Sequence, residues 1–120
     1  MAIVGASTQR RKFGNKAVRA FRDAGWEVFP VNIRADRVEG LEAVATVTDI
    51  PVALDRVSVY LHPDDTFAAL DGIAASQPQE VWLNPGSDDP RVVARARELG
   101  LEIRRGCSIV DVGMSPADYP

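Results

Sequence analysis

The sequence predicts an α/β protein in which a five-stranded, mostly parallel sheet lies between helices that cover both of its faces. Short apolar runs of strand length alternate along the 120 residues with segments whose apolar residues recur at helical spacing. The connections are short, and a strand–helix–strand unit favours a right-handed crossover between parallel strands. A chain of this length buries one core and is too short for a second, so residues 1–120 are predicted to form a single domain. We therefore expect a three-layer, Rossmann-like architecture.

The first half of the chain begins with a short apolar strand, predicted at Ala2–Gly5. The helix predicted at Lys16–Ala24 carries alanine, valine and phenylalanine side chains at helical spacing, and Gly25 is suited to end it in a left-handed conformation. A second strand is predicted at Glu27–Val31. The connecting stretch through Gly40, Leu41 and Val47 is poorly patterned, and we interpret it as a short irregular crossover that leads to Asp49-Ile50-Pro51.

The second half repeats the alternation with clearer signals. Proline and aspartate residues mark the starts of its two helices, and Gly100 ends the second one. The predicted elements are a strand at Arg56–Leu61, a helix from Pro63 to the residue before Pro78, a strand at Glu80–Leu83, a helix at Ser87–Leu99 and a strand at Leu101–Arg104. With strands numbered along the chain, we expect the order 3-2-1-4-5, which reverses between the first and fourth strands.

Composition excludes several classes of function. The net charge of −3 and the pI near 5.1 argue against a nucleic-acid-binding protein, which would carry a basic excess. The chain has no run of about 18 apolar residues that would span a membrane, and no secretory leader. Its single cysteine, Cys107, cannot form an internal disulfide, and one histidine with one cysteine is a poor basis for a metal site. We expect a cytoplasmic protein that binds neither nucleic acid nor a membrane.

The end of the first strand has the features of an anion-binding turn. Gly5, Ala6, Ser7 and Thr8 come between an apolar strand and a helix, whose N-terminus carries about half a unit of positive charge. The loop that follows is basic, and it lacks the dinucleotide fingerprint because its next glycine is Gly14. The segment therefore predicts a pyrophosphate site. The alternative is a loop of solvated charges in which Ser7 caps the helix.

The end of the second strand narrows the choice of ligand. An NAD enzyme places Asp or Glu here to bind the ribose hydroxyl, whereas this chain has Asn32 with Arg34 and Arg37 close by. A guanidinium binds phosphate well, so the pattern favours a phosphorylated ribose, as in NADP or coenzyme A. The alternative is a pair of surface arginines.

Groups suited to catalysis are few. His62 follows the third strand, where it is suited to a ligand contact or to the role of general base. Cys107 follows the fifth strand as either a small buried side chain or a thiol near the reactive end of a ligand. The aspartates Asp64, Asp65 and Asp89 are interpreted as helix-capping residues. No residue is predicted to be catalytic in its own right.

Several stretches together resemble a known family, the small stand-alone CoA-binding domain proteins, which are similar to the N-terminal CoA-binding domain of the succinyl-CoA synthetase α subunit. The matching stretches span nearly the whole chain in order. They are VGAS at 4–7, FGNKAVRAF at 13–21, VFPVN at 28–32, VEGL at 38–41, DIP at 49–51, LDRVSVYL at 54–61, EVWLNPG at 80–86 and RGCSIV at 105–110.

The resemblance implies a Rossmann-like fold with CoA lying across the strand ends. The turn of Gly5, Ala6, Ser7 and Thr8 would hold the diphosphate, and Asn32 and Arg34 would lie near the adenosine and its 3′-phosphate. The rest of the implied site comprises the adenine or ribose wall Leu61, His62 and Pro63, the pantetheine path Asn84, Pro85 and Gly86, Cys107 towards its end, and the further contacts Arg11, Lys12, Gly14, Asn15 and Val31. The chain departs from the family in two places. Ile33-Arg34 stands where many relatives have Pro-Lys, and His62 stands where the family usually has the first of two prolines.

We therefore expect a protein that binds coenzyme A or acyl-CoA without catalysing a reaction itself, as a sensor, carrier or regulatory module. It would act as a homo-oligomer or with a partner enzyme. The synthetase's ligation activity is not implied, because it needs a second domain and a partner subunit. The alternatives are a small NADP-dependent or acyl-transferring enzyme that uses His62 or Cys107, and an interaction protein with a vestigial pocket. A narrower hypothesis is a mixed disulfide between Cys107 and the CoA thiol.

Overall fold

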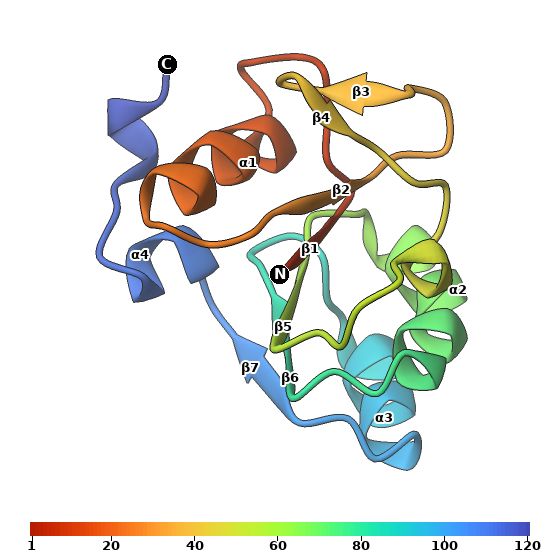
Figure 1. Ribbon diagram of the computed structural model, residues 1–120. Helices are drawn as coiled ribbons and strands as arrows, with labels where there is room; N and C mark the ends of the chain where they lie inside the picture. The colour runs from red at the N-terminus through yellow and green to blue at the C-terminus, as the bar shows by residue number, and fades with distance from the viewer.

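The computed structural model describes residues 1–120 and contains a five-stranded parallel sheet with helices on both faces (Figure 1). This confirms the predicted α/β, Rossmann-like class. The strands are β1 (Ala2–Val4), β2 (Phe29–Val31), β5 (Arg56–Val59), β6 (Glu80–Leu83) and β7 (Ile103–Arg105). The main helices are α1 (Phe13–Asp23), α2 (Pro63–Ala75) and α3 (Pro90–Glu98). In Figure 1, α1 lies on one side of the sheet, and α2 and α3 lie on the other.

The order of the strands corrects our expectation. The observed order is β2-β1-β5-β6-β7, which is 2-1-3-4-5 in the numbering used for the prediction, so the expected 3-2-1-4-5 is wrong. The strand at Arg56–Val59 pairs with β1 and has four buried residues, as a central strand requires. β2 is instead an edge strand, which suits the central Pro30 because proline has no N–H to donate to a further strand.

The chain between β2 and β5 is more regular than the sequence predicted. It forms a hairpin of β3 (Arg37–Val38) and β4 (Leu41–Glu42), followed by a 3-10 helix, η1 (Val47–Asp49). Elements of two or three residues are too short to show a period of 2 or 3.6 in their apolar pattern. A short helix, α4 (Ser108–Asp111), and a second 3-10 helix, η2 (Pro116–Asp118), were missed for the same reason.

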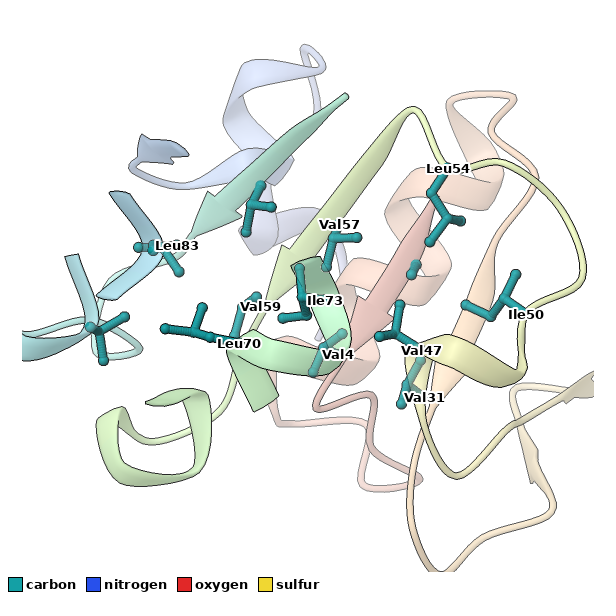
Figure 2. Packing of buried hydrophobic residues seen from close by; sticks show 14 of the residues in the cluster. Val4, Val31, Val47, Ile50, Leu54, Val57, Val59, Leu70, Ile73 and Leu83 are labelled. Carbon is teal, nitrogen blue, oxygen red and sulfur yellow. The ribbon is translucent and has the colours of Figure 1, made fainter. Parts of the chain in front are cut away.

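Two hydrophobic clusters hold the layers together, one on each face of the sheet. Successive residues of β1 point to opposite faces, so Ala2 and Val4 pack in one cluster and Ile3 in the other. Figure 2 shows the larger cluster, in which Leu70 and Ile73 of α2 pack on the valines of β5. Both side chains are fully buried, and each such burial stabilises the fold by about 1.5–3 kcal/mol.

The boundaries of the helices differ from the predictions by a few residues. Helix α1 begins at Phe13 rather than Lys16, and α3 begins at Pro90 rather than Ser87. Asp89 is the N-cap of α3, where its carboxylate accepts a hydrogen bond of 3.0 Å from the backbone N–H of Val92. Its predicted capping role is confirmed. None of the helices is both long and apolar enough to cross a membrane.

Candidate functional site

A single large cleft opens at the carboxyl ends of the strands, where the strand order reverses between β1 and β5. Its volume is about 1380 Å³, which exceeds the roughly 300–1,000 Å³ of pockets for drug-sized ligands. The loops that follow β1, β2, β5 and β6 contribute to its walls. A cleft of this size at this edge suits an extended ligand of the size of a nucleotide cofactor.

Most of the residues predicted from the sequence line this cleft. They are Gly5, Ala6, Ser7, Lys12, Gly14, Val31, Asn32, Arg34, Leu61, His62, Asn84, Pro85, Gly86 and Cys107. Four others do not line it: Thr8 and Arg11 are exposed in the loop after β1, Asn15 is buried beneath that loop, and Pro63 is the first residue of α2. Whether the lining residues contact CoA stays a prediction.

The turn after β1 is fixed by backbone geometry. Gly5 has a φ of +90°, a conformation that side-chain-bearing residues rarely adopt. The Ser7 hydroxyl oxygen accepts a hydrogen bond of 3.0 Å from the backbone N–H of Gln9. The N-cap of α1 is Lys12, so Ser7 does not cap the helix, and that part of the alternative is wrong. No side chain caps α1, which leaves the first N–H groups of the helix without a side-chain acceptor at the cleft.

The positive charges around this turn differ in their surroundings. Arg10 forms an ion pair of 2.7 Å with Glu39, and Arg37 lies 3.9 Å from the carboxylate of Glu42. Lys12 and Arg34 line the cleft and take part in no ion pair. These two are therefore the unpaired arginine or lysine side chains that line the cleft itself and can meet an anionic ligand there.

Asn32 is held in the cleft by its own side chain. Its Nδ2 donates a 2.9 Å hydrogen bond to the carbonyl of Ala6, and its Oδ1 accepts 2.8 Å bonds from the backbone N–H groups of Arg34 and Ala35. The side chain thus joins the end of β2 to the turn after β1. It also fixes the backbone at Arg34, which lines the cleft beside it.

A network of buried polar side chains lies beside the cleft, where β5 and β6 end. The Nδ2 of Asn84 donates to the hydroxyl of Ser58 at 2.9 Å, and its Oδ1 accepts from the backbone N–H of Ser108 at 2.9 Å. The hydroxyls of Ser58 and Ser108 are 2.5 Å apart, and the Tyr60 hydroxyl is 3.1 Å from that of Ser108. Burial raises the pKa of Tyr60 to about 12, so its hydroxyl stays protonated at neutral pH.

Sequence analysis missed one wall of the cleft, which forms where α2 packs against η1. It is lined by Ala68, Ala69 and Gly72 on one side and by Thr46, Val47 and Thr48 on the other. A Cβ on Gly72 would lie 3.9 Å from the side chains of Val47 and Thr48, so the two elements approach closely. In Figure 1, η1 lies beside α2. The small residues Ala68, Ala69 and Gly72 in α2 are the sequence signal that could have revealed this close approach.

The two candidate catalytic side chains lack an activating partner. His62 is the exposed N-cap residue of α2, and its ring makes no hydrogen bond within the protein. Cys107 is half-buried at the N-cap of α4. Neither is hydrogen-bonded to a neighbouring acid or base, the arrangement that activates a nucleophile or a general base.

The parallel sheet, its order and the cleft at its carboxyl edge define a Rossmann-like α/β protein. Residues 1–113 match a family described as the CoA binding domain, and the chain belongs to this family. Our identification of the family from sequence motifs is confirmed.

Three relatives illustrate the range of the family. The chain is 24% identical over 103 residues to the uncharacterized protein YneT of Bacillus subtilis, covering 86% of this chain and 76% of that one. It is 34% identical over 62 residues to the α subunit of acetate–CoA ligase (ADP-forming) II of Pyrococcus furiosus, which is 51% of this chain but 14% of the subunit. A conserved hypothetical protein of P. furiosus has a similar structure, with a TM-score of 0.85, 26% identity and coverage of 92% and 96% of the two chains.

Proposed function

We propose that the protein binds coenzyme A or an acyl-CoA and catalyses no reaction by itself. The observation that carries the proposal is the pair of unpaired cations, Lys12 and Arg34, in the cleft of a chain that belongs to the CoA binding domain family. CoA carries two separate anionic groups, a diphosphate and a 3′-phosphate. Lys12 follows the turn after β1 and Arg34 follows β2, so the cleft offers one cation to each of the two anionic groups.

The parts of CoA are assigned by the chemistry of the walls. The diphosphate lies at the Gly5–Thr8 turn, near the free N–H groups of α1 and near Lys12. The 3′-phosphate lies at Arg34, whose guanidinium binds phosphate in a bidentate fork. The adenine lies against the wall that Ala68 and Ala69 of α2 form with Thr46 and Thr48, and Leu61 and His62 wall the ribose. The pantetheine arm then passes Asn84, Pro85 and Gly86 towards Cys107.

The lack of an activated nucleophile or base supports a binding role. A sensor, carrier or regulatory module needs only a state that differs between the free and the bound protein. The 62 residues that match the acetate–CoA ligase α subunit are only 14% of that subunit, so most of the subunit lies outside the shared region. A separate partner that supplies the chemistry is therefore compatible with a binding role for the present chain.

Titration calorimetry with CoA, dephospho-CoA, NADP and NAD tests the proposal. We expect CoA to bind most tightly, and dephospho-CoA to bind about tenfold more weakly because it loses a charge-assisted contact. The variant Arg34→Gln should weaken CoA binding and abolish the difference between these two ligands. Arg37→Gln is the matched control, since this nearby arginine does not line the cleft.

Three results would count against the proposal. Tighter binding of NADP than of CoA would favour an oxidoreductase. Equal losses for Arg34→Gln and Arg37→Gln would refute the assignment of the 3′-phosphate. Binding of none of the four ligands would overturn the function altogether.

A further inference from the structure

Glu39 has an unusual backbone conformation at the tip of the β3–β4 hairpin. Its φ is +50°, and that of Gly40 after it is +78°. Positive φ at both central residues of a two-residue loop is the type I′ arrangement, in which Asn-Gly is the favoured pair. A glutamate at the first position is strained, because its Cβ crowds the backbone in the left-handed region. Such strain persists where surrounding contacts hold it, and it often marks a functional site.

The contacts that hold Glu39 all lead to the segment before and within α1. The Nη1 of Arg10 donates a 2.7 Å hydrogen bond to Oε1, and the Nδ2 of Asn15 donates one of 3.2 Å to Oε2. The Nη1 of Arg22 donates to the Glu39 carbonyl at 2.9 Å. Only 15% of the Glu39 side chain is exposed, against 86% for Glu42 in the same hairpin.

Asn15 carries these contacts on to the anion-binding turn. The same Nδ2 donates a 2.9 Å hydrogen bond to the carbonyl of Ser7, so Glu39 and Ser7 share one donor group. Arg19 completes the arrangement, since its Nη2 donates to the carbonyl of Arg10 and its Nε to the Oδ1 of Asn15, both at 2.8 Å. The loop from Ser7 to Lys12 is therefore tied down at Ser7 and at Arg10. Glu39 itself does not line the cleft.

We propose that Glu39 is a positioning residue for the diphosphate of the ligand: it holds the 7–12 loop in the conformation that the anion requires. This inference rests on the proposed function. It has a clear alternative, because a carboxylate near an anion site can act through its charge. Removing that charge would free Arg10 and draw an anion in more strongly, whereas removing a positioning contact would weaken binding. The two roles predict opposite signs.

Three variants separate these roles. Glu39→Asn gives the hairpin its favoured Asn-Gly turn, so the protein should fold at least as well, but the shorter side chain cannot span to Arg10. Glu39→Gln removes the charge and keeps both the length and an acceptor oxygen. Glu42→Gln is the matched control, because it removes a carboxylate from the same hairpin without touching the loop.

Two measurements are made on each protein: amide hydrogen exchange of the 7–12 loop without ligand, and the Kd of CoA by calorimetry. For Glu39→Asn we expect faster exchange in the loop and CoA binding weaker by about tenfold, the loss of one charge-assisted contact. Glu39→Gln should stay within about threefold of the parent protein, because the amide oxygen still accepts from Arg10. Glu42→Gln should change neither quantity.

Different outcomes would overturn the role of Glu39 and the proposed CoA binding. Tighter CoA binding in both Glu39 variants would show that the residue acts as a charge and would overturn the proposal. Unchanged loop exchange in Glu39→Asn would overturn it as well, whatever the affinity. Absence of CoA binding in the parent protein would refute the proposed function and the ligand role of Glu39, while faster exchange would still establish that Glu39 orders the loop.

Discussion

The α-carbon of Gly14 lies so close to Gly5 that a Cβ built on Gly14 would be 2.1 Å from the Gly5 carbonyl oxygen and 3.0 Å from its carbonyl carbon. The first turn of α1 is thereby pressed against the turn that follows β1. The contacting atoms belong to the backbone, so they cannot move aside as the end of a flexible side chain would. The two glycines together allow the N-terminus of α1 to approach the anion-binding turn.

Gly14→Ala should therefore disrupt both stability and binding. We expect a loss of about 1–3 kcal/mol in the free energy of unfolding, as for other overpacked positions. We also expect a larger loss of CoA affinity than for the exposed variant Arg34→Gln. Gly72→Ala is the control for stability alone, because Gly72 lines the cleft. Its Cβ would meet ordinary contacts of 3.9 Å with the side chains of Val47 and Thr48, so the free energy of unfolding should rise by about 0.5–1 kcal/mol. Urea denaturation measures the stability of both variants, and titration calorimetry measures CoA binding by Gly14→Ala. Equal stability of the two variants would contradict the close approach of Gly14 to Gly5.

Asn84 should contribute strongly to stability, although it resembles a ligand-contacting loop residue in the sequence. Its side chain is 2% exposed and bonds Ser58, Val59 and Ser108. Asn84→Ala would leave buried donors and acceptors unpaired, at a cost of about 2–3 kcal/mol in the free energy of unfolding. The exposed amide variant Gln79→Ala should change it by less than about 0.5 kcal/mol. Similar denaturation midpoints for the two variants would show that the network is not needed for stability.

The sequence predicts single helices and strands better than it predicts the order of the strands in the sheet. The apolar run at 80–83 and the proline and acids at 63–65 each predict a single element, and the structure confirms both the strand and the helix. The strand order depends instead on which strand pairs with β1, and no periodicity encodes that choice. Pro30 carried the one local signal, because a strand with a central proline belongs at an edge.

In the candidate site too, local features could be predicted from the sequence, whereas contacts between distant residues could not. Residues at strand ends were predictable, because all parallel strands present their carboxyl ends to one edge, and most of them do line the cleft. The contacts between Glu39 and Arg10, and between Asn84 and Ser108, join residues 29 and 24 positions apart. Such pairings follow from packing of the whole chain. Short elements such as the β3–β4 hairpin, which carries Glu39, are too brief to show a pattern.

The N-cap of α3 should give the protein a pH-dependent stability. The hydrogen bond from the Val92 N–H, with a further contribution from Arg91, lowers the pKa of Asp89 below its ordinary value of 3.8. The ionised cap therefore stabilises the folded state fully above pH 3.8, and this contribution is lost as the pH falls through the lower pKa of the folded protein.

Asp89→Asn tests this effect, because an asparagine oxygen still caps a helix but does not titrate. Thermal unfolding across the acid range should show a shallower loss of stability for Asp89→Asn than for the parent protein. Asp89→Ala, which has no cap, should be less stable at every pH. Parallel acid profiles for the parent and Asp89→Asn would rule out the contribution of this carboxyl.

The position of Cys107 provides a direct test of where the pantetheine arm ends. The thiol is half-buried and lines the cleft, so iodoacetamide should alkylate it in the free protein. S-methyl-CoA, whose sulfur does not consume the reagent, should cover it and slow alkylation by about tenfold at a ligand concentration ten times its Kd. Adenosine 3′,5′-bisphosphate lacks the pantetheine arm, so at the same occupancy it should leave the rate unchanged.

Intact-mass spectrometry follows the alkylation of Cys107 in the presence of each ligand. Equal protection by the two ligands would place Cys107 at the nucleotide end, and no protection by S-methyl-CoA would move the arm out of this part of the cleft.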